Sequence, residues 1–159
     1  MERALAESNA LEAERKALDL ISRAPHTKSG LRIKLLRRGF DEASVEQSLR
    51  RMEEMGYIDD AGFCEQWLHS RLQRHPEGRQ ALLAGLIKRG ISPALAQSTL
   101  DGEFTADEEE QCARRVLAKL PQDRRDSRTK VARRLSARGF GAPLIYRILE
   151  EMPSESPED

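Results

Sequence analysis

The stretch LRIKLLRRGFDEASVEQSL, residues 31–49, places an arginine, a glycine and a large apolar residue between two segments with helical spacing. Leu31 and Leu35 lie one helical turn apart, so they form an apolar stripe on a short helix. Gly39 follows at the point where a helix commonly ends in the left-handed conformation, which glycine adopts without a Cβ penalty. The stretch therefore predicts a helix, a glycine turn and a second helix that begins after the cap residue Asp41.

The same pattern occurs twice more, around Gly90 and Gly139, which follow the preceding glycine of the pattern by 51 and 49 residues. Five positions are apolar in all three copies: eight and four residues before the glycine, and one, six and ten residues after it. In that order they hold Leu31, Leu82 and Val131; Leu35, Leu86 and Leu135; Phe40, Ile91 and Phe140; Val45, Ala96 and Ile145; and Leu49, Leu100 and Leu149. Agreement at five positions identifies an internal repeat.

A further helical segment precedes each of these helix pairs, over roughly residues 12–22, 60–74 and 106–119. In the second segment Phe63, Trp67 and Leu68 fall on one helical face. Before the third segment, Thr105 and Glu108 have the spacing of a capping box. Each repeat is therefore predicted to contain three helices.

The predicted fold is all-α, with three tandem three-helix repeats that form an elongated, curved helical array. Units of this size bury little surface alone and are stabilised by their neighbours. The predicted divisions are a polar N-terminal extension at residues 1–10, repeats at residues 11–58, 59–104 and 105–152, and an acidic C-terminal tail at residues 153–159.

The composition favours a polar helical protein, with 38% hydrophobic and 34% charged residues. The formal net charge is +0, but residues 113–138 hold ten Lys or Arg against two acids, which predicts a basic patch. No apolar run approaches the roughly 20 residues of a membrane span, and no signal peptide is recognisable. Two cysteines in separate segments indicate reduced thiols and no disulfide framework. We therefore predict a cytoplasmic protein.

No catalytic or metal-binding motif is present in the sequence. His26, His69 and His75 have neither the spacing of metal ligands nor a cysteine partner. There is no G-x-S-x-G elbow and no phosphate-binding loop. Runs of acids such as Asp59-Asp60 fall at predicted helix starts, where they favour the helix dipole. The sequence thus predicts a protein that is not an enzyme and needs no cofactor or metal.

The basic residues have two interpretations. An arginine before each glycine stabilises the C-terminal end of a helix, typically by about 0.3–1 kcal/mol. The same arginine could present one cation per repeat to a polyanion. In the third repeat Lys130, Arg133 and Arg134 fall within a stripe roughly 80° wide, away from the apolar face. Such a cluster is suited to phosphate contact, although it could also be only a solvated face.

The segment GYIDD at residues 56–60, followed by Phe63, Trp67 and Arg71 and by LIKRGI at residues 86–91, resembles the RecX family of recombination regulators. The resemblance extends over about residues 11–150 and is strongest between residues 31 and 104. Cys64 departs from the family, which usually has an alanine at this position.

The resemblance implies a regulatory protein in homologous recombination, DNA repair and the SOS response. Such a protein binds the RecA nucleoprotein filament on single-stranded DNA, by occupying its groove or by blocking its extension. It thereby inhibits the recombinase, ATPase and coprotease activities of RecA. The partners implied are the RecA filament and its single-stranded DNA, with the chain acting as a monomer. The residues we expect to contact these partners are Arg37, Arg38, Arg71, Lys88, Arg89, Lys130, Arg133, Arg134 and Arg138.

Two other functions fit the residues. A direct DNA-binding protein could use its helix pairs as helix-turn-helix units without sequence preference. Against this, Arg147 is the only basic residue on the predicted helix after Gly139. A helical scaffold that binds a peptide is the other possibility, and it predicts an exposed apolar groove.

Overall fold

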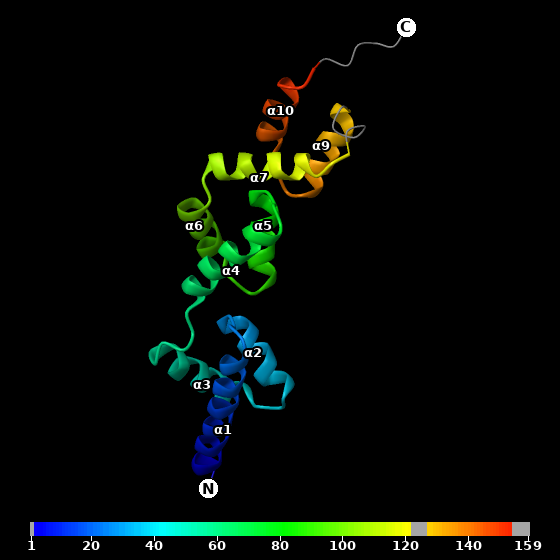
Figure 1. Cartoon of the computed structure of the whole chain (residues 1–159). Coiled ribbons are helices and arrows are strands. Elements are labelled where there is room, and N and C mark those ends of the chain that lie inside the picture. Colours follow the sequence, from blue (N-terminus) through cyan, green and yellow to red (C-terminus); the bar gives the residue numbers. More distant parts are fainter. Residues whose placement is uncertain (1, 122–126, 154–159) are drawn as a thin grey trace. The chain divides into compact units, whose positions relative to one another are not determined.

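The computed structural model describes residues 2–121 and 127–153, which form helices and no strand (Figure 1). In chain order the helices are α1 (Glu2–Arg23), α2 (Lys28–Arg37), α3 (Glu42–Glu54), α4 (Asp60–Arg74), α5 (Arg79–Lys88), α6 (Pro93–Glu103), α7 (Ala106–Ala118), α9 (Arg128–Ala137) and α10 (Ala142–Glu150). They group by threes around the glycines of the sequence pattern. The predicted all-α fold with tandem three-helix repeats is therefore confirmed.

The predicted capping residues are found at the starts of α3 and α7. Asp41 caps α3 by accepting a hydrogen bond from the backbone N–H of Ser44 at 2.9 Å. Thr105 and Glu108 form the predicted capping box at the start of α7.

The first helix differs from its prediction, because α1 begins at Glu2 and not near residue 12. Its first turns are rich in Ala, Leu and Glu, which favour a helix even where no apolar stripe is present.

The three pattern glycines all adopt the left-handed conformation that their position predicts. Their φ angles are 90° for Gly39, 86° for Gly90 and 81° for Gly139. Arg38 and Arg138 are the C-cap residues of α2 and α9, so each arginine stands at the helix end and each glycine one residue beyond it. The helix–glycine–helix interpretation of the quoted stretch is confirmed.

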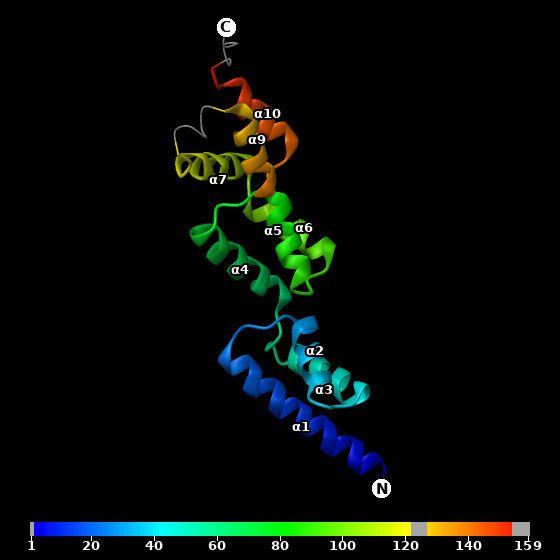
Figure 2. The ribbon, with the colours of Figure 1, turned by 90° about the vertical axis from the view of Figure 1, so that its right-hand side faces the viewer.

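The repeated apolar positions form the core. In the first repeat Leu31, Leu35, Val45 and Leu49 are fully buried, and α1 packs against α3 and α2 (Figures 1 and 2). In the third repeat α9 packs against α10 and α7 (Figure 2). Of the fifteen aligned side chains, only those of Phe40 and Leu149 are half-buried. The core is thus set by the same positions in every repeat.

Contacts divide the chain into two compact units. The first unit extends to Glu65 and includes Ile87–Ser92; the second comprises Gln66–Leu86 and the chain from Pro93 onward. Two junctions between consecutive repeats each lie wholly within one unit, so each can be described by itself. The repeat boundaries and the curvature of the array stay predictions.

The first junction joins the start of α2 to the turn that follows α5, inside the first unit. The Thr27 hydroxyl donates to the carbonyl oxygen of Arg89 at 2.6 Å, and the Lys28 N–H donates to Asp60 Oδ1 at 2.9 Å. A Cβ on Gly90 would lie 2.5 Å from Cβ of Ser29. The left-handed glycine therefore also allows the preceding repeat to approach closely.

The second junction repeats this arrangement inside the second unit. The N–H of Gly78 donates to the carbonyl oxygen of Arg138 at 2.9 Å, and the N–H of Arg79 donates to Glu109 Oε1 at 2.8 Å. A Cβ on Gly139 would clash with the backbone nitrogen of Ala81. Arg-Gly thus ends a helix in every repeat, and in the second and third repeats it also receives the start of another helix.

Candidate anion-binding surface

Helix α9 positions the basic cluster predicted in the third repeat. Ser127 caps the helix by accepting a hydrogen bond from the N–H of Lys130 at 3.4 Å. Val131 and Leu135 face the core and are buried. The side chains of Lys130, Arg133 and Arg134 are exposed, as their helical phase predicts. The amphipathic pattern of α9 therefore presents three cations together on one solvent face.

A hollow of about 730 Å³ lies beside this face. Four of its lining residues are cationic: Lys119 at the end of α7, and Lys130, Arg133 and Arg134 of α9. Leu120, Pro121 and Ala137 are the other described residues in the lining, and no described lining residue carries a carboxylate. The described lining of this hollow is therefore positively charged and suits an anionic ligand.

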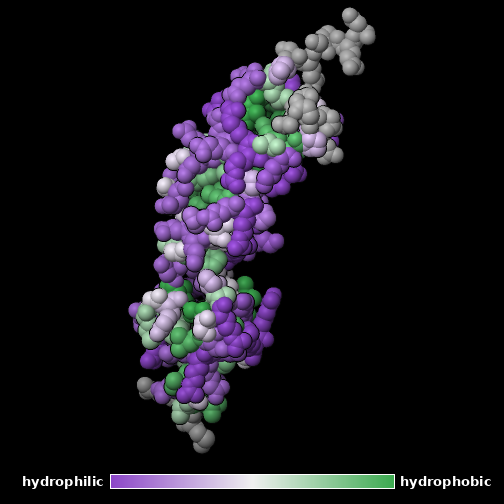
Figure 3. Space-filling model, in the orientation of Figure 1, coloured by the Kyte–Doolittle hydropathy of each residue, from purple (hydrophilic) through white to green (hydrophobic). Residues whose placement is uncertain are grey.

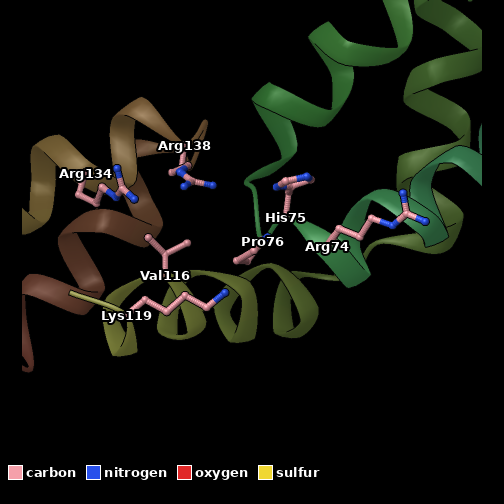
Figure 4. Close-up of a pocket in the computed structure, with 7 residues that line it drawn as sticks. All are labelled: Arg74, His75, Pro76, Val116, Lys119, Arg134 and Arg138. Carbon is pink, nitrogen blue, oxygen red and sulfur yellow. The ribbon is translucent and has the colours of Figure 1, made fainter.

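A second hollow of about 90 Å³ shares two of these cations (Figure 4). Lys119 and Arg134 line it together with Arg74, His75, Pro76, Val116 and Arg138. Figure 4 shows that these residues come from three segments: the end of α4, the C-terminal part of α7, and α9 with the turn after it. Buried Pro76 and Val116 anchor the segments. We call the six cations of the two hollows the third-repeat surface: Arg74, Lys119, Lys130, Arg133, Arg134 and Arg138.

No carboxylate of the described residues neutralises the charges of the third-repeat surface. None of its six cations forms an ion pair with another residue in the part of the chain that the structure describes. Arg114 of the same unit behaves differently: it pairs with Glu110 at 2.6 Å and with Glu151 at 2.9 Å. Those carboxylates raise the pKa of Arg114. The third-repeat surface is therefore available to an external anion.

The other residues predicted to bind a partner do not join this surface. Arg37 is exposed without an ion pair among the described residues, and Arg38 donates to the carbonyl oxygen of Lys34 at 3.0 Å. Lys88 and Arg89 are exposed in the first unit. The nine predicted residues are thus distributed over two separate units.

Arg71 has a structural partner within its own repeat. Its guanidinium donates two hydrogen bonds to the carboxylate of Glu77, at 2.9 and 2.8 Å, and the pair raises the pKa of Arg71. The pair fixes the segment between α4 and α5. The binding role of Arg71 stays a prediction, whereas its bidentate contact accounts for an arginine at this position.

Lys119, Arg74 and His75 were not among the sequence candidates. Arg74 and His75 belong to the second repeat, and its packing against the third repeat brings them into the hollow that Arg134 lines, whereas Lys119 ends α7 within the third repeat. Lys119 falls in the basic stretch 113–138, whereas the one sequence signal of Arg74 and His75 was their position at the end of a first helix. The repeat places the segment that follows this helix next to the following repeat, as the junctions show.

The described residues contain no cluster of three His, Cys, Asp or Glu side chains that could hold a metal ion. Cys64 and Cys112 are free thiols in the core, as their apolar positions predict. Burial raises the pKa of the Cys112 thiol, so it remains protonated at neutral pH. None of the helices in residues 2–121 and 127–153 is long and apolar enough to cross a membrane.

Comparison with known proteins decides the family. The family model for the first three-helix domain of RecX matches residues 13–52, and the model for the second three-helix domain matches residues 59–100. The chain belongs to the RecX family. The resemblance seen in the GYIDD segment and the LIKRGI stretch is confirmed.

Relatives of this RecX chain extend the match over most of its length. The regulatory protein RecX of Treponema pallidum (strain Nichols) is 35% identical over 138 residues, which cover 87% of this chain and 84% of the relative. That of Thermobifida fusca (strain YX) is 35% identical over 146 residues, covering 89% and 79%. The crystal structure of RecX from Lactobacillus salivarius superposes with a TM-score of 0.83 at 18% identity, over 92% of this chain and 97% of that one. The family is one of regulatory proteins, and the fold is shared.

Proposed function

We propose that this RecX chain binds the RecA nucleoprotein filament as a cytoplasmic monomer. Binding inhibits the recombinase, ATPase and coprotease activities of RecA, because the chain occupies the filament groove or blocks filament extension. The observation that supports the proposal is the third-repeat surface, six cations without intramolecular ion pairs among the described residues. The chain that carries this surface belongs to the same family as the regulatory proteins named RecX.

The chemistry of this surface favours phosphate contact. Lysine and arginine that neutralise phosphates release counterions, and this effect gives salt-dependent affinity for nucleic acid. No Phe, Tyr or Trp is among the described residues that line either hollow, so base stacking there is poorly supported. The surface therefore suits the phosphodiester backbone and not base readout. It is compatible with DNA of any sequence.

The test is the rate of ATP hydrolysis by RecA on single-stranded DNA, with the RecX chain titrated below the RecA concentration. The double variant Arg133→Glu/Arg134→Glu should require a much higher concentration for half-inhibition. The control Arg15→Glu/Arg50→Glu changes the net charge equally, at exposed arginines without ion pairs among the described residues. It should inhibit like the native chain.

Circular dichroism would establish that both variants retain their helices. If the Arg133→Glu/Arg134→Glu chain inhibits as well as the native chain at physiological salt, the third-repeat surface does not contact the filament. If the native chain leaves ATP hydrolysis unchanged, regulation of RecA is the wrong function for it.

Direct DNA binding without RecA is the second candidate, because the same cations would serve it. The helix-turn-helix version of that idea is disfavoured by α10, the helix in the reading position. Its one basic residue, Arg147, pairs with Glu110 at 2.9 Å. A recognition helix needs several polar side chains free to reach base edges. Binding to the backbone of DNA through α9 remains compatible with both candidates.

A further inference from the structure

A hollow in the first unit differs in chemistry from the third-repeat surface. It has a volume of about 420 Å³ and lies between the start of α2 and the end of α5. Its lining comes from residues 24–34, from Phe63 of α4 and from residues 87–90. All of these belong to the first unit. We call this hollow the first-unit groove.

The floor of the first-unit groove is apolar. Ile33 is 46% exposed and Ile87 is 42% exposed, and half-buried Phe63 lies with them in the lining. Seven large hydrophobic side chains are exposed among the described residues, and two of the seven are in this one hollow. The face shown in Figure 3 is mostly hydrophilic, with hydrophobic residues gathered in limited areas. An exposed apolar cluster on so polar a protein indicates a binding site.

The rim of the groove is cationic. Lys34, Lys88 and Arg89 line it, and its lining includes no carboxylate. Lys88 forms no ion pair with any residue in the ranges that the structure describes. Lys34 Nζ lies 2.6 Å from Nε2 of His26, which keeps the ammonium at the groove. These cations would attract an occupant with acidic side chains.

The groove is preformed by the first junction. The Thr27–Arg89 and Lys28–Asp60 hydrogen bonds fix the start of α2 against the turn after α5. Ile33 of α2 and Ile87 of α5 are therefore held in one hollow whose walls do not have to assemble on binding. Preformed sites of this kind lose less entropy when they bind a ligand.

The two surfaces therefore fit different partners. Phosphates need clustered cations and derive nothing from exposed isoleucines, whereas protein interfaces combine an apolar centre with a polar rim. We propose that the first-unit groove binds a short segment of a partner protein in which apolar side chains are flanked by Asp or Glu. This inference rests on the proposed function, since that segment belongs to RecA in the filament. The third-repeat surface would contact the DNA, and the groove would contact the protein.

The test uses the full chain with the double variant Ile33→Asp/Ile87→Asp. Two quantities are measured: inhibition of RecA ATP hydrolysis on single-stranded DNA, and binding of a fluorescein-labelled oligo-dT without RecA. The concentration for half-inhibition should rise about tenfold or more, as is typical when apolar contacts at an interface centre are lost. Affinity for oligo-dT should change by less than about twofold. Both substituted residues are already exposed, so the fold should tolerate the changes.

The matched control is Leu11→Asp/Tyr146→Asp, at side chains that are 52% and 68% exposed and outside the groove. It adds the same charge and should inhibit like the native chain. Lys88→Glu is a second groove variant that leaves the apolar floor intact, and it should also weaken inhibition. If the groove variants inhibit normally while the native chain inhibits, the groove proposal is wrong and the proposed function stands.

A photo-crosslinking experiment identifies what the groove contacts. The chain carries p-benzoylphenylalanine in place of Ile87, and in a comparison sample in place of Ala137, which lines the larger hollow of the third-repeat surface. After irradiation with the assembled filament, Ile87 should give adducts to a RecA peptide that contains acidic and apolar residues. Adducts of Ile87 to the DNA, or to no component while Ala137 crosslinks, would overturn the groove proposal. Absence of adducts at both positions, with no inhibition by the native chain, would overturn the proposed function as well.

Discussion

At the scale of single residues, the pattern glycines share a backbone conformation but not an environment. A Cβ on Gly39 would meet no atom of the described residues within 4 Å, whereas one on Gly90 would meet Ser29. One on Gly139 would meet the backbone of Ala81. The sequence predicts the left-handed conformation at all three, because each follows the last turn of a helix. It could not predict the crowding, because that depends on which repeat packs against the turn.

Alanine substitutions should reveal this difference. Gly39→Ala is expected to lower the free energy of unfolding by roughly 1–2 kcal/mol, the cost of a Cβ in the left-handed region. Gly139→Ala should cost more, because the Ala81 backbone cannot move without straining the 3.1 Å hydrogen bond from the Gln80 N–H to Gly139. Urea unfolding of both variants would measure the two losses. Equal losses in the free energy of unfolding would show that the residues at the second junction move aside for the added Cβ without a further energetic cost.

At the scale of one element, the start of α7 combines a cap with a titratable group. Glu108 accepts hydrogen bonds from the N–H and the hydroxyl of Thr105, both at 2.8 Å. These bonds lower the pKa of Glu108 below its ordinary 4.5. The sequence predicts this box from two residues three positions apart. Local signals of this kind are recoverable without the tertiary structure, whereas the contacts of Lys119 or Arg74 with α9 are not.

Removing the cap should weaken α7 locally. Thr105→Ala is expected to lower the free energy of unfolding by about 1 kcal/mol, the typical loss for an N-cap hydroxyl.

Because the pKa of Glu108 is lower in the folded state, its charge stabilises the fold above pH 4.5 and ceases to do so as the pH falls below that value. Glu108→Gln should therefore be less stable than the native chain at pH 7, and this difference in stability should be smaller at pH 3. Thermal unfolding of Glu108→Gln and of the native chain at both pH values would measure this difference, with Asp107→Asn as a control that removes the same charge. A difference in stability between Glu108→Gln and the native chain that is the same at both pH values would contradict the prediction.

At the scale of the whole molecule, the repeat explains what could be predicted and what could not. The aligned apolar columns predict the helices and nearly all of the core, because burial at those positions is required in every copy. The length of α1 was underestimated, since helix propensity acts there without an apolar stripe. The third-repeat surface was predicted in part: Lys130, Arg133, Arg134 and Arg138 were expected from the sequence, whereas Arg74 comes from the second repeat and joins them only through packing. The first-unit groove depends on a junction and has no local signature.

Salt dependence provides a quantitative check of the third-repeat surface. Affinity for single-stranded DNA should fall with salt, with a slope of about −0.7 in log–log form for each phosphate contact. Removing two contacts with Arg133→Glu/Arg134→Glu should make that slope shallower by about 1.4. Fluorescence anisotropy of labelled oligo-dT between about 50 and 200 mM salt would measure it. An unchanged slope would mean that these arginines do not touch phosphate.

The open turn at Gly39 has a consequence for how such chains could grow. Both junctions use a helix start that donates to a turn carbonyl and to an acidic side chain, and neither depends on an elaborate set of side chains. The turn at Gly39 has the same backbone conformation, and a Cβ there would meet none of the described residues within 4 Å. A tandem duplication of one repeat within the gene would therefore supply both complementary halves of a new junction at once. Chains with an added repeat could arise in a single genetic step and fold without further mutation.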